Sequence, residues 1–209
     1  MAQDWNNDLE PLLKQYKNRK HPLDYNNRYQ LLVMVVLSAQ ATDDLINKIA
    51  KDFFIAYPTI ADLGKATPEE VHKLVKSVRS FGKKTTWLLQ IAEMIGTDDK
   101  IPTRMDELIK FPGLGRKSAN VIIRELKGTA EGIIVDLHVV RVAPRLGIAS
   151  GDKPEQIEKQ MMSALDKNLW GDAGMSISFL GREICRPTPD CLNCIMTKVC
   201  KFYQEVVKK

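Results

Sequence analysis

The chain has 209 residues, of which 44% are hydrophobic, and its 31 lysines and arginines against 26 acids give a net charge of +5. This composition indicates a soluble globular protein with a proper core and excludes a disordered chain. The N-terminal stretch MAQDWNNDLEP lacks the apolar core of a signal peptide, and the most apolar run, residues 31–39, is too short to span a bilayer. We therefore expect a cytoplasmic protein with no membrane association. The positive charge permits a polyanionic partner without requiring one.

Helical patterns run through the whole chain. Residues 31–38 have apolar positions at helical spacing, and Thr67–Glu70 combines an N-cap, a proline and the returning glutamate of a capping box. Asp152 and Pro154 give a second start signal. The branched stretch 132–143 has no evident strand partner, so the sequence predicts an all-α fold of roughly ten helices.

A basic segment precedes the middle of the chain. Residues 71–90 contain five cations and no acid. Such a run is typical of a solvated helix face and equally typical of a surface that meets phosphate.

The stretch FPGLGRKSANVI, residues 111–122, places two glycines two positions apart and then starts an apparent helix. A tight turn of this kind between two helices directs backbone N–H groups at a phosphate, and a side chain at Gly113 or Gly115 would obstruct that approach. Arg116 and Lys117 follow at once. The pattern predicts a helix–hairpin–helix that binds DNA through its phosphates, with Arg116 as a phosphate contact.

Asp136 lies nineteen residues after Lys117, in the segment IVDLH. Aspartate there is a suitable N-cap for a helix that starts near Leu137. A carboxylate close to an amine can also accept its proton, so Lys117 is either a nucleophile or a phosphate clamp. Both roles of Asp136 can hold together.

All four cysteines lie near the C-terminus, as Cys185, Cys191, Cys194 and Cys200 with spacing C-x5-C-x2-C-x5-C. Disulfides are not expected in a reducing compartment. Zinc sites usually combine two separate C-x2-C knuckles, and only one is present. The spacing therefore favours an iron–sulfur cluster over zinc, held by one short and irregular segment.

Several motifs occur together in a fixed order: SAQATD at 38–43, the hairpin at 111–122, VDLH at 135–138, GREIC at 181–185 and then the cysteines. In this combination the chain resembles the endonuclease III family of helix–hairpin–helix DNA glycosylases, from about residue 10 to the C-terminus. The resemblance implies an all-α, two-lobed fold. Residues 23–130 would form a six-helix barrel lobe. Residues 1–22 and 131–209 would form the lobe that carries a [4Fe–4S] cluster on the four cysteines.

The resemblance also implies the activity, which is base-excision repair by a DNA glycosylase and abasic-site lyase acting on oxidised pyrimidines in double-stranded DNA. Lys117 matches the family's nucleophile and Asp136 its essential aspartate. Gln40 matches a residue that fills the space left by a flipped nucleotide. Ser80 stands at the position of the apolar wedge, where Phe81 or Arg79 can take over. The protein is expected to act as a monomer associated with the nucleoid.

Two departures from the family pattern concern the substrate. The first cysteine loop, CRPTPDC, is one residue shorter than the usual loop and has Arg186 as its single cation. The family's VDTH is VDLH here, with apolar Leu137 beside the aspartate. Alternatives are therefore an abasic-site lyase with a narrowed lesion range, or a DNA-binding module without chemistry. A mismatch adenine glycosylase is disfavoured because SAQATD lacks the glutamate of that branch.

Overall fold

A computed structural model describes residues 3–208, and no strand occurs in this part of the chain. The predicted all-α class is confirmed. The branched stretch 132–143 has no regular structure up to Asp136, forms no strand among the described residues, and is helical from Leu137 onward. No helix found between residues 3 and 208 combines the length and the apolar character that a membrane span needs.

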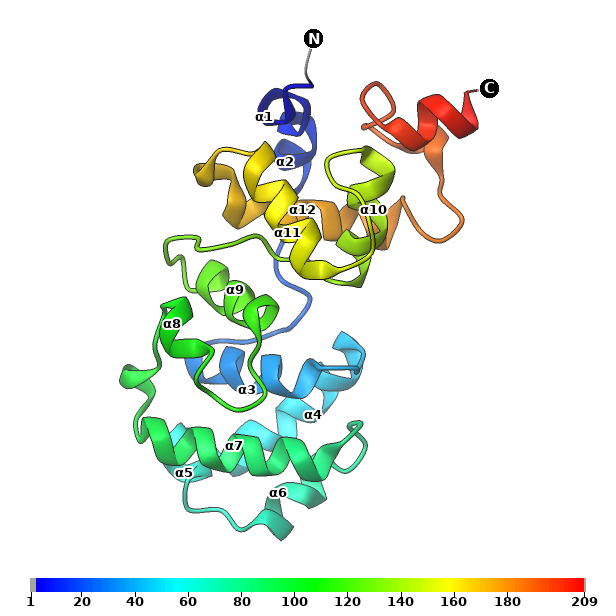
Figure 1. Ribbon diagram of the computed structural model, residues 1–209. Helices are drawn as coiled ribbons and strands as arrows, with labels where there is room; N and C mark the ends of the chain where they lie inside the picture. Colours follow the sequence, from blue (N-terminus) through cyan, green and yellow to red (C-terminus); the bar gives the residue numbers. More distant parts are fainter. Residues whose placement is uncertain (1–2, 209) are drawn as a thin grey trace. The chain divides into compact units, whose positions relative to one another are not determined.

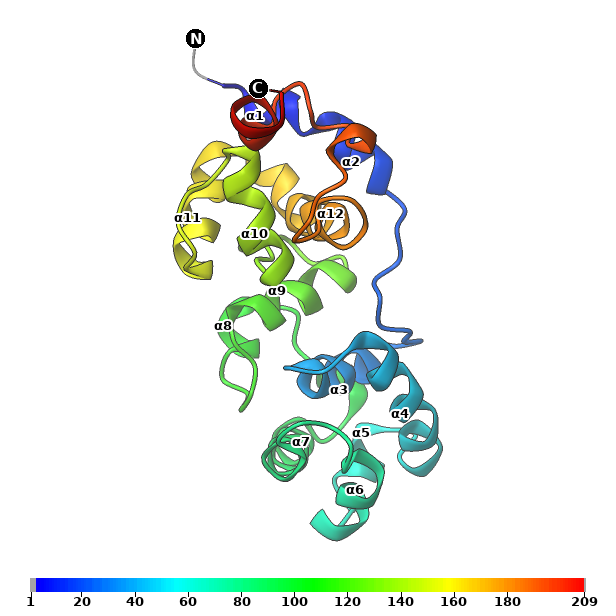
Figure 2. The same cartoon turned by 90° about the vertical axis from the view of Figure 1, so that its right-hand side faces the viewer.

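The chain forms two compact units, which are coloured along the sequence in Figure 1 and Figure 2. One unit is Lys20–Gly128, and the other joins the residues up to Arg19 with those from Thr129 onward. The lobe boundaries inferred from the family resemblance, at residues 23 and 130, remain a prediction.

The Lys20–Gly128 unit contains α3 (Arg28–Ser38), α4 (Asp43–Ala56), α5 (Ile60–Leu63), α6 (Pro68–Val75), α7 (Phe81–Ile95), η1 (Asp98–Lys100), α8 (Met105–Leu108) and α9 (Arg116–Glu125). Helix α3 is its centre, because it contacts α4, α7 and α9 and is buried from Leu31 to Leu37. This explains why residues 31–37 are apolar on every side. Helix α6 begins with the predicted capping box, in which Thr67 and Glu70 bond each other's backbone N–H groups.

The second unit contains α1 (Trp5–Asp8), α2 (Glu10–Tyr16), α10 (Leu137–Leu146), α11 (Pro154–Ala164), η2 (Lys167–Leu169), α12 (Trp170–Glu183), η3 (Cys191–Asn193) and η4 (Tyr203–Val207). Helix α12 is buried from Ala173 to Gly181 and packs against α10 and α2 (Figure 2). Two glycines permit this packing. A Cβ atom at Gly174 would collide with the Ile134 backbone, and one at Gly181 would lie 2.8 Å from the Cβ of His138.

The predicted start of α11 is wrong in one detail. The N-cap is Lys153 rather than Asp152, and it makes no side-chain hydrogen bond to the helix. Pro154 does occupy the first turn, where its fixed φ and missing N–H suit a helix start. The proline therefore begins this helix without the help of an acidic cap.

Candidate active site and cysteine cavity

The hairpin between α8 and α9 is built around Gly113. Gly113 has φ +80°, a left-handed conformation, and a Cβ atom there would collide with the indole of Trp87. Gly115 differs, because its φ is −96° and no atom lies within 4 Å of the position of its Cβ. Conformation and packing thus require glycine at position 113. At position 115 the absence of a side chain leaves open space beside the start of α9.

Lys117 lies in the first turn of α9, next to Arg116, and both side chains are exposed. The middle of this helix, from Ala119 to Ile123, is buried on every side, so the exposed cations lie at its first turn. Burial lowers the pKa of His21 to about 4, and Glu125 and Asp43 oppose this shift while Lys117 and Arg124 add to it. A neutral imidazole therefore belongs to the electrostatic surroundings of the Lys117 amine.

Asp136 is the N-cap of α10 and is half-buried. Its Oδ1 accepts the backbone N–H groups of His138 and Val139, each at 2.9 Å. Its Oδ2 accepts the hydroxyl of Ser178 on α12 at 2.6 Å. Three donors from two helices hold this carboxylate in one orientation. The N-cap role considered from the sequence is confirmed.

Ser178 has no counterpart in the sequence-based predictions. It lies inside the run Ala173–Gly181, which is buried throughout, and its own exposed fraction is 0%. A hydroxyl in such a run needs a partner, because a buried polar group without a hydrogen bond is costly. The serine within an apolar run therefore indicated that some hydrogen-bond partner exists. The sequence did not identify this partner as Asp136.

Leu137 and His138 follow Asp136 on α10. Leu137 is 70% exposed, beside the half-buried carboxylate of Asp136. Nδ1 of His138 lies 3.2 Å from Nη2 of Arg141, and that guanidinium also donates to the carbonyl oxygens of Gly181 and Cys185. These contacts give His138 a structural role beside Asp136.

The residues expected to insert into DNA lie in strained turns of the Lys20–Gly128 unit. Gln40 and Ser80 both have φ 57°, in the left-handed region, and both are exposed. Ser80 is the N-cap of α7 and makes no side-chain capping bond. Phe81 is 37% exposed, with the edge of its ring against His72 at a centroid distance of 5.3 Å. Arg79 is exposed.

The basic segment, residues 71–90, is not a solvated face throughout, because Lys84 is buried. Only 2% of this residue is exposed, and its Nζ donates to the carbonyl oxygens of Leu37 and Ala39 at the end of α3. The cations Lys73, Lys76, Arg79 and Lys83 are exposed.

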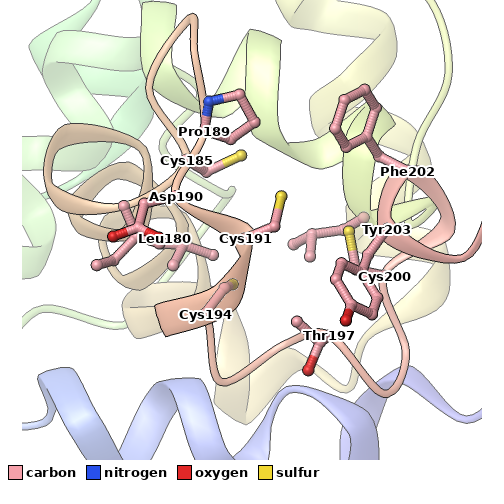
Figure 3. A pocket seen from close by; sticks show the side chains of 12 residues that line it. Leu180, Cys185, Pro189, Asp190, Cys191, Cys194, Thr197, Cys200, Phe202 and Tyr203 are labelled. Atoms are coloured by element: carbon pink, nitrogen blue, oxygen red, sulfur yellow. The ribbon is translucent and has the colours of Figure 1, made fainter. Parts of the chain in front are cut away.

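The four cysteines line one cavity, as Figure 3 shows. Cys185 follows α12, Cys191 begins η3, Cys194 ends it, and Cys200 is buried. All four are free thiols. Within residues 3–208, no three His, Cys, Asp or Glu side chains are grouped as ligands of a single metal ion. Four free cysteines around one cavity are a donor set that fits an iron–sulfur cluster.

Burial raises the pKa of the thiols of Cys191, Cys194 and Cys200, and the neighbouring cysteines raise these pKa values further. Both effects favour the neutral thiol over the thiolate at these three positions.

Arg145 holds the short cysteine loop. Its guanidinium donates to the carbonyl oxygens of Arg186 at 2.7 Å and Pro187 at 3.0 Å, and it lies 3.5 Å from Sγ of Cys185. It also lies over the ring of Phe202, 5.1 Å from the centroid. The loop is therefore anchored to α10 despite being one residue shorter than is usual.

The comparisons with known proteins all indicate the same family. The family description "HhH-GPD superfamily base excision DNA repair protein" matches residues 33–167. Endonuclease III of Rickettsia conorii is 36% identical over 205 residues, which cover 97% of each chain. Endonuclease III of Bacillus subtilis is 33% identical over 205 residues, covering 96% of this chain and 93% of its own.

Solved structures are similar over nearly the same length. A non-covalent endonuclease III–DNA complex has a TM-score of 0.84 at 33% identity, covering 96% of this chain and 95% of its own. A trapped covalent endonuclease III–DNA intermediate has a TM-score of 0.85 at 32% identity and covers 96% of each chain.

Proposed function

This chain belongs to the endonuclease III family, within the HhH-GPD superfamily of base excision DNA repair proteins, and we propose that it is a bifunctional DNA glycosylase and abasic-site lyase. Its substrate would be double-stranded DNA with an oxidised pyrimidine or an abasic site. The observation that carries the proposal is an exposed lysine in the first turn of α9, directly after the Gly113 hairpin. A similar protein has been trapped as a covalent intermediate on DNA.

Lys117 would be the nucleophile. Its amine attacks C1′ of the damaged nucleotide, the base leaves, and the sugar becomes an imine of the lysine. The imine acidifies the C2′ proton, whose removal expels the 3′ phosphate by β-elimination. Excision and strand cleavage therefore follow from the same amine.

Asp136 would assist the step at C1′. An amine attacks only when unprotonated, and a carboxylate can accept the proton or stabilise the positive charge that develops on the sugar. The bonds from His138, Val139 and Ser178 support this role, because they keep the carboxylate in place before substrate arrives. His138 contributes a backbone N–H and needs no part in the chemistry.

DNA would be held mainly through phosphates. The start of α9 has no side-chain cap, so its N–H groups and partial positive charge are suited to a phosphate, with Arg116 beside them. Gln40 and Ser80 would contact the duplex where a nucleotide is flipped out, with Phe81 as the apolar neighbour of Ser80.

Cys185, Cys191, Cys194 and Cys200 would hold a [4Fe–4S] cluster. The cluster would close the C-terminal segment into a folded unit and take no part in base excision. This proposal is supported by four free thiols around one cavity. The monomeric state and the cytoplasmic, nucleoid-associated location remain predictions.

Borohydride trapping tests the proposal. Wild-type protein incubated with abasic duplex DNA and borohydride should give a covalent complex, and Lys117→Ala should give none. Arg116→Ala is the matched control, because it removes a neighbouring cation and should still trap at saturating protein. Equal trapping by Lys117→Ala would refute the assignment. DNA binding by the wild type with no trapping and no strand cleavage would favour a non-catalytic module instead.

The lesion is tested separately. Duplexes with thymine glycol or dihydrouracil should be cut by the wild type. A duplex with adenine opposite oxidised guanine should stay intact. Cleavage restricted to preformed abasic sites would indicate a lyase with a narrowed lesion range.

A further inference from the structure

Lys84 is the one lysine or arginine among residues 3–208 that is classed as buried, with 2% of its surface exposed. Its Nζ donates to the Leu37 carbonyl at 2.8 Å and to the Ala39 carbonyl at 2.5 Å. Burial lowers the pKa of this amine. Its partners are the carbonyls at the end of α3, where the helix dipole places partial negative charge. Lys84 therefore acts as a C-terminal cap for α3 from another helix.

The carbonyls that Lys84 binds belong to the turn that presents Gln40. The backbone N–H of Ala41 donates to the Ser38 carbonyl at 3.0 Å, Ala39 has φ −55° and ψ 116°, and Gln40 has φ 57°. These values are typical of a type II turn with Gln40 at the position that glycine usually occupies. A non-glycine residue in this conformation costs about 1–3 kcal/mol, so surrounding contacts must hold it.

The same lysine belongs to the first turn of the helix that presents Ser80. The backbone N–H of Lys84 donates to the Ser80 carbonyl at 3.1 Å, and Ser80 has φ 57° and ψ 35°. The two left-handed residues of this unit that are expected to meet DNA are thus connected through one residue. Lys84 bonds one turn with its backbone and the other with its side chain.

We propose that Lys84 is a positioning residue that fixes the Gln40 turn against the start of α7, so that Gln40 and Ser80 enter the duplex as one rigid element when a nucleotide is extruded. The proposal rests on the proposed function, because it assumes that these turns meet DNA. Backbone strain held by specific contacts is common where a protein must be preorganised for a ligand. A rigid pair holds the flipped state without first ordering two separate turns.

The experiment compares Lys84→Met with Lys83→Met. Lys83 is an exposed neighbour over the Trp87 ring, so its variant removes the same charge without touching the α3 carbonyls. The first readout is the fluorescence of 2-aminopurine placed beside a thymine glycol, which rises when the bases unstack. The second is single-turnover excision from that duplex, set against β-elimination at an abasic site in a single-stranded oligonucleotide, which needs no extrusion.

Lys84→Met should lower both the fluorescence rise and the duplex excision rate about tenfold, because two charged hydrogen bonds to the turn are lost. Its rate on the single-stranded substrate should change less than about twofold, since the amine of Lys117 is untouched. Lys83→Met should weaken DNA affinity and leave the fluorescence at saturating protein unchanged.

Equal losses on duplex and single-stranded substrates, or wild-type fluorescence in Lys84→Met, would overturn the positioning role. If Lys84→Met melts below the assay temperature, Lys84→Gln takes its place, because its amide is a neutral donor. Absence of borohydride trapping by the wild type would instead defeat the proposed function, while the fluorescence would still report on Lys84.

Discussion

The helices that carry Lys117 and Asp136 begin in opposite ways. Helix α9 starts after a glycine, with no side-chain cap, whereas α10 starts at Asp136, whose own carboxylate accepts the first N–H groups. An uncapped start keeps its partial positive charge available for an outside anion, and a capped start does not. An N-terminal helix turn is thus left open to an anion in one unit, and in the other it holds an acid in place.

The largest loss of excision rate is expected for Asp136→Asn, which changes the acid at the start of α10 and keeps the cap. Asparagine is as good an N-cap as aspartate, so the helix start and the melting temperature should be preserved. Excision should fall about 10³-fold or more, because the amide can neither accept a proton nor stabilise a cation. Single-turnover rates on a thymine glycol duplex measure the loss.

Asp136→Ala is the control for that result. It removes the cap as well as the charge, and stability should then fall by about 1 kcal/mol. Should Asp136→Asn excise at the wild-type rate, the carboxylate would be a helix cap and nothing more.

The next largest effect is expected for the glycines of the hairpin that precedes α9. Gly113→Ala should destabilise the protein by about 2–4 kcal/mol, because alanine must adopt a positive φ and displace Trp87. Gly115→Ala should cost less than about 1 kcal/mol of stability, since its Cβ enters open space. It should instead weaken binding to abasic DNA, where the backbone must approach a phosphate. Thermal melting and fluorescence anisotropy separate the two outcomes. Equal destabilisation by both variants would contradict the distinction.

Much of the local structure could be predicted from sequence because it depends on neighbours. The capping box at Thr67 and the apolar character of α3 needed only residues a few positions apart. The helical patterns along the chain also predicted the all-α class, which the structure confirms. The family resemblance added the roles of Lys117 and Asp136, which remain predictions.

The contacts that hold the predicted functional residues in place could not be predicted from sequence, because they join residues far apart in the chain. Ser178 bonds Asp136 across 42 positions of sequence, and Lys84 bonds Leu37 across 47. Nothing local separates Ser178 from its neighbour Ser176, or Lys84 from the exposed Lys83. The five cations of residues 71–90 are typical of an exposed surface, and only the tertiary partners of Lys84 explain its burial.

A smaller effect should follow Ser178→Ala. The carboxylate of Asp136 loses one of its three donors, and excision should fall about tenfold, which corresponds to the loss of one hydrogen bond to a charged group. Cleavage at preformed abasic sites should fall less, because the base has already left. Ser176→Ala is the matched control, since Ser176 is also buried on α12, with 3% exposed. If both variants excise equally well, Ser178 serves packing alone and α10 holds the acid without help from α12.

The smallest effect concerns the surroundings of Lys117. Burial holds the pKa of His21 at about 4 in the folded protein, whereas an unfolded histidine has a pKa of about 6.5. Between these values the unfolded state binds a proton that the folded state does not, so stability is complete above pH 6.5 and declines as the pH falls toward 4. Protonation would also cost the bond in which Nδ1 accepts the Leu23 N–H at 3.1 Å. We expect the free energy of unfolding to fall by about 1 kcal/mol at pH 5. This is less than the full pKa difference implies, because His21 is not wholly shielded from water.

Thermal melting at pH 7 and pH 5 should show a smaller pH effect for His21→Asn than for wild type. The control is His72→Asn, which removes the ring that lies 5.3 Å from Phe81 between centroids and should behave as wild type. An identical pH effect in all three proteins would mean that the imidazole near Lys117 titrates as it does in water.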